Sequence, residues 1–196
     1  MQVRLDKRAR IIADGGQAYP VDLLRDHTLV QVRQKYTDDT GELTLAPGEE
    51  TTDEVTVGGR VVFVRNTGKL CFASLQDGFT ETSNGERLQI MLSKAEVGDE
   101  SLAAWKSDVD LGDHVWVRGR VVVSRRGELS IMAAEWRMAA KALRPLPTLH
   151  KELSEETRVR RRYVDLVVRD ESRQMVRTRA AITRAVRRAL DERGFL

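Results

Sequence analysis

Two neighbouring strand-like runs, in residues 70–76 and 88–92, carry aromatic and polar side chains on one face. Because side chains alternate between the two faces of a strand, Phe72 and Gln89 fall opposite the aliphatic residues of their runs. A third run, 128–131, turns Glu128 outward in the same way. The companions expected on the polar face are Ser74, Gln76 and Ser130, and those expected on the buried face are Cys71, Ala73, Leu75, Leu88, Ile90, Leu92, Leu129 and Ile131.

An exposed aromatic ring beside an amide and a carboxylate can read an unpaired nucleobase. The ring offers a surface on which a base can stack, and the polar groups can hydrogen-bond the edge of that base. The residues alone also allow a plainer interpretation. In it, Phe72 packs under an N-terminal helix, and Gln89 and Glu128 are ordinary solvated side chains of a one-sided sheet.

The charge of the chain is unevenly distributed. Residues 51–136 carry 10 Lys and Arg against 13 Asp and Glu, whereas residues 137–196 carry 16 against 8. The base-reading region is therefore slightly acidic. This disfavours a non-specific single-strand binder, since such proteins follow the backbone with a positive groove. It is compatible with a module that reads a few bases while another part of the molecule holds the phosphates.

The elements that must position these side chains follow from periodicity and turn residues. We expect helices over 3–13 and 28–36, and a linker over 37–50. Strands are expected at 55–65, 69–77, 87–93, 114–124 and 128–134, with a helix at 100–106 and a bulge or sharp coil at Gly58-Gly59. Two more helices should follow, one opened by Ser154 and ending at Val168, the other over 170–193.

The predicted fold class is mainly β. Three strands, a helix and two further strands are the order of a five-stranded Greek-key barrel of the oligonucleotide/oligosaccharide-binding (OB) type. The longest apolar runs, such as 121–123, are too short to span a bilayer, and the N-terminus lacks the apolar region of a secretory signal. Cys71 is alone, which excludes a disulfide within the chain and fits a reducing cytosol. The three histidines, His27, His114 and His150, lack metal-ligand spacing.

Three segments together form a recognisable pattern. The first is residues 59–77 with Leu88-Gln89, the second is KALRPLP (141–147), and the third is RVRRRYVDLVV (158–168) followed by ESR (171–173). In this order they resemble the N-terminal part of class II lysyl-tRNA synthetases of the bacterial type. The first is similar to the anticodon-binding barrel of the lysine, aspartate and asparagine enzymes. The second is similar to a linker of the lysine enzymes, and the third to the start of motif 1.

The resemblance implies roles for four residues. Phe72 would stack on an anticodon base, Gln89 and Arg65 would hydrogen-bond the central uridine, and Glu128 would contribute to the neighbouring base. It also implies a helical extension and linker at 1–50, an OB-fold anticodon-binding domain at 51–140, a linker at 141–153 and, at 154–196, the helical start of an α+β catalytic domain that is otherwise missing.

For the full-length protein the resemblance implies ATP- and magnesium-dependent attachment of lysine to a lysine-accepting tRNA, by a cytoplasmic homodimer. The family's motifs 2 and 3, which hold ATP, magnesium and lysine, do not occur in this sequence. We therefore expect no catalytic residue, metal site or cofactor in this chain, and no aminoacylation by it alone. The sequence would end as motif 1 begins, and the apolar stripe of its last helix would pack against a second subunit.

The sequence departs from the family pattern at two points. It has Val64-Arg65-Asn66 where many relatives have two adjacent arginines, and its loop 78–86 is longer than the family's tight turn. In addition, Arg65 shares strand parity with Val61 and Phe63, so alternation alone does not expose it.

Other functions stay open on the residues. One is a stand-alone barrel that binds single strands without catalysis, and another is a synthetase-like part of an enzyme that transfers lysine to membrane lipid. The arginines at 158 and 160–162 could follow tRNA phosphates or form a solvated helix face. We favour the solvated face, because Glu155, Glu156 and Asp165 lie close enough in sequence to pair with them.

Overall fold

The computed structural model describes residues 1–78, 86–147 and 153–195. The chain forms two compact units. The first contains residues 1–77 and 86–145, and the second contains the C-terminal segment from Leu146 onwards. Each unit is described by itself.

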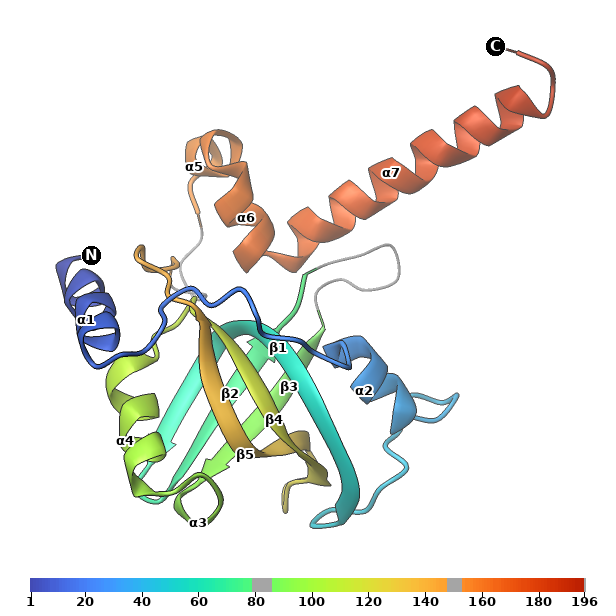
Figure 1. Cartoon of the computed structure of the whole chain (residues 1–196). Helices are drawn as coiled ribbons and strands as arrows, with labels where there is room; N and C mark the ends of the chain where they lie inside the picture. The colour runs from blue at the N-terminus through green and yellow to red at the C-terminus, as the bar shows by residue number, and fades with distance from the viewer. Residues whose placement is uncertain (79–85, 148–152, 196) are drawn as a thin grey trace. The chain divides into compact units, whose positions relative to one another are not determined.

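Five strands close into a barrel in the first unit (Figure 1). They are β1 (Glu50–Thr67), β2 (Leu70–Gln76), β3 (Arg87–Ser93), β4 (His114–Val123) and β5 (Leu129–Ala140). The order around the barrel is β1-β2-β3-β5-β4, with β4 returning to β1, and only β3 and β5 run parallel among these pairs. The predicted OB-type barrel is confirmed. β5 ends six residues later than predicted, because Glu135 to Ala140 continue to pair with the start of β4.

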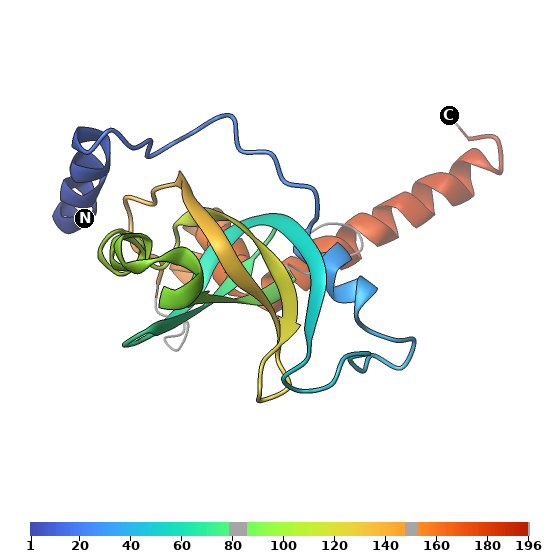
Figure 2. The same ribbon diagram turned by 60° about the horizontal axis from the view of Figure 1, so that its bottom comes forward.

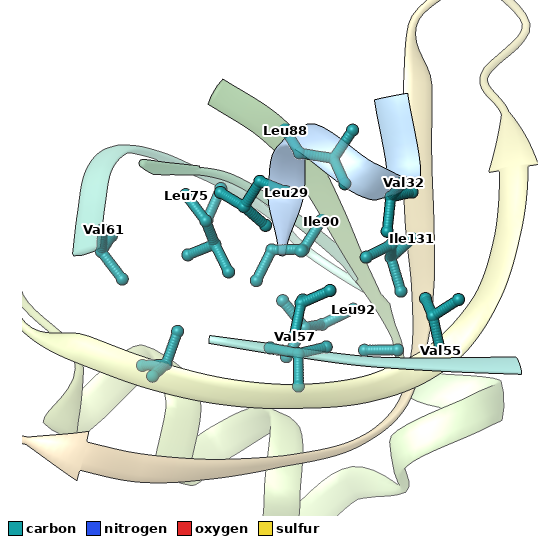
Figure 3. Close-up of a cluster of buried hydrophobic side chains, with 14 of the residues drawn as sticks. Leu29, Val32, Val55, Val57, Val61, Leu75, Leu88, Ile90, Leu92 and Ile131 are labelled. Atoms are coloured by element: carbon teal, nitrogen blue, oxygen red, sulfur yellow. The ribbon is translucent and has the colours of Figure 1, made fainter. Parts of the chain in front are cut away.

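Helices contribute to the core from two sides of the barrel. Leu29 and Val32 of α2 (Leu29–Lys35) are fully buried and lie among side chains from the strands (Figure 3). Leu102 and Trp105 of α4 (Asp99–Asp108) join the same core, and Figures 1 and 2 show α4 and α2 on opposite sides of the barrel. The sequence encodes the start of α2 in a capping box, in which Thr28 accepts a hydrogen bond from the Gln31 backbone N–H.

The remaining helices of this unit are α1 (Gln2–Ala13) and the short α3 (Lys94–Val97). Lys7 of α1 forms an ion pair of 2.8 Å with Asp110, just after α4. Gly59 packs so closely against β2 that an added Cβ would lie 3.1 Å from Cβ of Leu75. This explains the glycine, but the bulge predicted at Gly58-Gly59 lies instead at Val62, where the register between β1 and β2 shifts.

A buried lysine fixes the chain as it leaves the barrel. The Lys141 side chain is fully buried, and its ammonium donates to the carboxylates of Asp110 (2.6 Å) and Asp113 (2.7 Å) and to the Asp108 carbonyl (2.6 Å). Burial alone would raise the pKa of Asp110, but hydrogen bonds from Lys141 and Lys7 outweigh it and the pKa is lowered. The first residue of KALRPLP is thus part of the barrel's packing.

The second unit contains α5 (Glu155–Arg160), α6 (Arg162–Val168) and α7 (Asp170–Asp191). Ser154 caps α5 as predicted, but the single helix predicted up to Val168 is broken at Arg161, whose φ and ψ of −121° and 53° are not helical. Asp165 is fully buried and accepts hydrogen bonds from Arg162 (2.8 Å), Arg169 (3.2 Å) and Ser172 (2.6 Å). This network links the RVRRRYVDLVV and ESR segments.

Candidate nucleic-acid interface

A β-bulge in β1 decides which of its side chains face outward. Val61 pairs with Leu75 and Phe63 pairs with Ser74, so Val62 is an extra residue between two otherwise regular pairs. One extra residue moves all later side chains of the strand to the other face. Val61 and Val62 are consequently both buried, whereas Phe63 is 54% exposed and Arg65 is exposed. Alternation counted from Val61 places Phe63 and Arg65 on the inner face, which is wrong for this reason.

The outer face of the sheet carries two rows of side chains that run across the strands. Successive Cα partners define the first row as Phe63, Ser74, Gln89 and Ser130, on β1, β2, β3 and β5. The second row is Arg65, Phe72, Met91 and Met132. The rows are two residues apart along each strand, which separates them by about 7 Å. Three of the four predicted site residues therefore lie on one continuous surface.

Arg65 and Phe72 contact each other directly. They are Cα partners on β1 and β2, and the guanidinium carbon of Arg65 lies 4.7 Å from the centroid of the Phe72 ring. The Phe72 side chain is half-buried and directed away from the barrel core, which Cys71 and Ala73 face. The Arg65 guanidinium therefore lies against the ring, and a side chain of this kind can move aside.

Gln89 is held in one orientation by its neighbour on β5. Its Nε2 donates to Oγ of Ser130 at 2.8 Å, and the Ser130 hydroxyl donates in turn to the Glu128 carbonyl at 2.9 Å. A glutamine amide has two donor hydrogens and two acceptor lone pairs on its oxygen. After the bond to Ser130, the carbonyl oxygen and one N–H can still contact a ligand.

Glu128 immediately precedes β5 and lies two residues before Ser130. Its side chain is 55% exposed, and Oε1 is 3.9 Å from Nη2 of Arg33 on α2. The same arginine lies 2.8 Å from the Glu86 carboxylate and donates to the Arg87 carbonyl at 2.7 Å. An exposed ion pair at 3.9 Å contributes little free energy. Glu128 can therefore turn toward a ligand at low cost.

Two residues predicted on the polar face are buried, namely Gln76 and Ser130. Ser130 does lie on the predicted side of the sheet, because its hydroxyl accepts a hydrogen bond from Gln89 on the outer face. Next to Gln76, burial raises the pKa of Asp77, and a backbone hydrogen bond from Glu86 opposes that rise. Alternation gives the face of a side chain but not what covers that face.

Sequence reasoning assigned no site role to Phe63, Ser130 or Arg33. The signal for Phe63 was the adjacent pair Val61-Val62, since two β-branched residues in sequence are consistent with a bulge that buries both. The link between Ser130 and Gln89 depends on the parallel β3–β5 pairing, which brings together residues 41 positions apart. The sequence did not predict the contacts of the loop 78–86. Most of this loop lies outside the described residues.

Comparison with known proteins gives two family matches. Residues 55–139 match the OB-fold nucleic acid binding domain, and residues 154–196 match the class II tRNA synthetases of the D, K and N group. The whole chain is 59% identical to the lysine–tRNA ligase of Kineococcus radiotolerans and, over 195 residues, 55% identical to lysine–tRNA ligase 1 of Mycobacterium tuberculosis. The chain is a homologue of the lysine–tRNA ligases.

The chain spans little more than a third of the length of those relatives, 37% and 36% respectively. It is also 38% identical to the lysylphosphatidylglycerol biosynthesis bifunctional protein LysX of Rhodococcus jostii, of which it spans 16%. The higher identities favour the lysine–tRNA ligases over this second kind of relative, and the class II match favours them over a stand-alone binding module.

Neither a membrane helix nor a metal centre is found in the part of the chain that the structure describes. None of its helices is both long and apolar enough to cross a bilayer. Within residues 1–78, 86–147 and 153–195, no three His, Cys, Asp or Glu side chains are grouped to bind a metal ion.

Proposed function

We propose that this chain is the anticodon-recognition region of a lysine–tRNA ligase. The observation that carries the proposal is the outer face of the barrel, where the Arg65–Phe72 pair lies beside Gln89 on a domain that matches an OB-fold nucleic acid binding family. Phe72 is the stacking platform for one anticodon base. Gln89 and Arg65 hydrogen-bond the central uridine, and Glu128 contacts the neighbouring base.

The chemistry of uracil suits these side chains. Its Watson–Crick edge presents one N–H between two carbonyl oxygens, so it needs one acceptor and one or two donors. The free carbonyl oxygen of Gln89 accepts from the N–H, while its second N–H and the Arg65 guanidinium donate to the carbonyls. Cytosine offers no N–H at the same position and would leave the Gln89 oxygen without a donor, which costs discrimination energy.

The parent protein attaches lysine to a lysine-accepting tRNA in the cytoplasm, under this proposal. ATP and magnesium are proposed as cofactors of that parent protein because its relatives are class II lysine–tRNA ligases. What this chain supplies is selectivity, because tRNAs with other anticodons lose the contacts to the outer face of the barrel.

The domain division proposed from the sequence, with boundaries at 50, 140 and 153, gives the second unit a separate role. α7 exposes Met175, Ile182, Val186 and Leu190, which follow near-helical spacing. We assign this stripe to the dimer interface of the parent protein. Ile182→Asp in the parent protein should convert dimer to monomer in analytical ultracentrifugation, and a dimer of unchanged dissociation constant would contradict the assignment.

The decisive experiment is titration of the 196-residue chain with synthetic anticodon stem-loops. One stacked base contributes about 1–3 kcal/mol, so Phe72→Ala should raise the Kd for the lysine anticodon roughly tenfold or more. Leu24→Ala is a suitable control, because Leu24 is 85% exposed and lies outside the barrel strands. An unchanged Kd for Phe72→Ala, with the fold verified by circular dichroism, would contradict the proposal.

The same titration separates the remaining alternative. A non-specific single-strand binder would bind stem-loops of any central base equally, with a steep salt dependence set by many phosphate contacts. An anticodon reader instead prefers uridine at the centre, and Gln89→Leu should relax that preference more than it lowers overall affinity.

A further inference from the structure

The exposed ring of Phe63 is not used by the site described above. Its side chain is 54% exposed, whereas the aliphatic residues around it in β1, Val61 and Val62, are buried. The β-bulge at Val62 turns this ring outward on the same face as Arg65 and Phe72. Single exposed aromatic side chains are common on protein surfaces, so exposure alone does not indicate a binding site. The position of Phe63 relative to Gln89 and Phe72 is more informative.

Phe63 begins the row that contains Gln89. Its Cα partner is Ser74, and Ser74 is in turn the partner of Gln89. Phe72 lies in the next row, diagonally from Phe63, and diagonal neighbours on paired strands are about 7–8 Å apart, within reach of aromatic side chains. The two rings thus stand on neighbouring strands with a serine beside them.

We propose that Phe63 is a second stacking platform, which holds the anticodon-loop nucleotide next to the one on Phe72. Proteins that bind single strands stack successive bases on successive aromatic side chains, and every base has a π-face that such a ring can use. The inference rests on the proposed function, and adds to it a contact that selects for an unpaired neighbour without reading its identity.

The surroundings favour a nucleotide over a protein surface as the occupant. Protein interfaces bury contiguous apolar patches, whereas Phe63 has the polar Ser74 and the charged Arg65 beside it on the outer face as well as the ring of Phe72. The Ser74 hydroxyl can contact the ribose or phosphate of a nucleotide whose base lies on the ring. The surface is also continuous with the proposed reading site.

The test compares Phe63→Ala, Phe63→Leu and Phe63→Trp with Phe72→Ala, by titration of the 196-residue chain with the lysine anticodon stem-loop. A stacked base lost should raise the Kd roughly tenfold for Phe63→Ala. Phe63→Leu should bind almost as weakly as Phe63→Ala, because leucine keeps the bulk but loses the π-face. Phe63→Trp should bind as tightly as the unchanged chain. Leu24→Ala again serves as the control.

Abasic stem-loops then identify the partner nucleotide. Removing the base that stacks on Phe63 should weaken binding by the unchanged chain but have little further effect on Phe63→Ala. The position found in this way should be adjacent to the one that couples to Phe72→Ala. The same position for both rings would overturn the inference.

The outcomes also separate the inference from the proposed function. If Phe72→Ala weakens binding and Phe63→Ala does not, the second platform is wrong and the anticodon role stands. If neither variant weakens binding, both fail. If Phe63→Ala lowers the melting temperature of the chain with no change in Kd, Phe63 is a packing residue and the inference is overturned.

Discussion

The guanidinium of Arg65 lies over the ring of Phe72, with 4.7 Å between the guanidinium carbon and the ring centroid. A cation–π contact at an exposed site contributes about 0.5–1 kcal/mol. A stacked base contributes about 1–3 kcal/mol. A base can therefore displace the guanidinium from the ring. The guanidinium then becomes available to hydrogen-bond the edge of a base. In the free chain Arg65 thus covers the platform that it would help to fill.

Arg65→Lys tests this exchange while it keeps the charge. An ammonium has no planar face and no paired donors, so lysine replaces neither the stacking nor a two-pronged hydrogen bond. We expect the Kd for the lysine anticodon stem-loop to rise about five- to tenfold, which corresponds to about 1 kcal/mol, the contribution of one ordinary hydrogen bond. The slope of log Kd against log salt should stay the same, because no positive charge is lost. A changed slope with an unchanged Kd would contradict a reading role for Arg65.

Ser130→Ala tests the positioning of Gln89. The variant removes the acceptor of the Nε2 hydrogen bond, so the amide becomes free to rotate. We expect preference for uridine over cytosine at the central position to fall several-fold, while binding of the uridine stem-loop changes less. Because Ser130 is buried, the variant should also lose about 1 kcal/mol of stability. Equal discrimination by the variant and the unchanged chain would show that Ser130 does not orient Gln89.

Lys141→Ala should be strongly destabilising. The buried ammonium has two carboxylate partners, and removing one member of a buried ion pair costs about 3–5 kcal/mol. Chemical denaturation of the barrel measures this loss. Arg118→Ala is the matched control, since Arg118 forms an exposed pair with Glu135 at 3.0 Å and should cost less than about 1 kcal/mol. Comparable losses for the two variants would contradict the structural role of Lys141.

His114 should make the barrel less stable in mild acid. Burial, reinforced by the positive charge of Arg60, lowers its pKa to about 4 from the ordinary value of 6.5. Between these two pH values the unfolded chain binds more protons than the folded chain, so stability falls as the pH drops through this window. His114→Gln should flatten the fall in melting temperature between neutral pH and pH 4.

The carboxylates act in a separate window. The pKa values of Asp110 and Asp165 are lowered because hydrogen bonds and positive charges outweigh their burial, so their contribution is lost only below about pH 4. A His114→Gln variant with an unchanged profile above pH 4 would show that His114 does not control this part of the pH dependence.

The sequence predicted the barrel because its signals are local. Alternation gave the inner faces of β2 and β3 correctly, and the turn residues Gly68 and Gly127 marked the strand ends. Alternation failed for Phe63, because the bulge inserts one extra residue and so reverses the face of every side chain that follows it. It also failed to show the burial of Ser130, which depends on strand pairing between distant segments.

The buried lysine shows a different limit. In the sequence, KALRPLP indicates an extended linker, because its two prolines disfavour helix. Lys141 is nevertheless buried, since Asp108, Asp110 and Asp113 provide oxygens that replace its hydration. Lysine is usually found at the surface, and only the position of its carboxylate partners shows that Lys141 is buried.

The extra residue at Val62 constrains how this surface can evolve. Deleting it would exchange the inward and outward side chains over the rest of β1, so Val64 would face solvent while an aromatic ring and a guanidinium would point into an aliphatic interior. No single substitution could repair such a deletion, because every later position of the strand would be displaced together. Length in this segment should therefore vary less among functional homologues than the identity of its side chains.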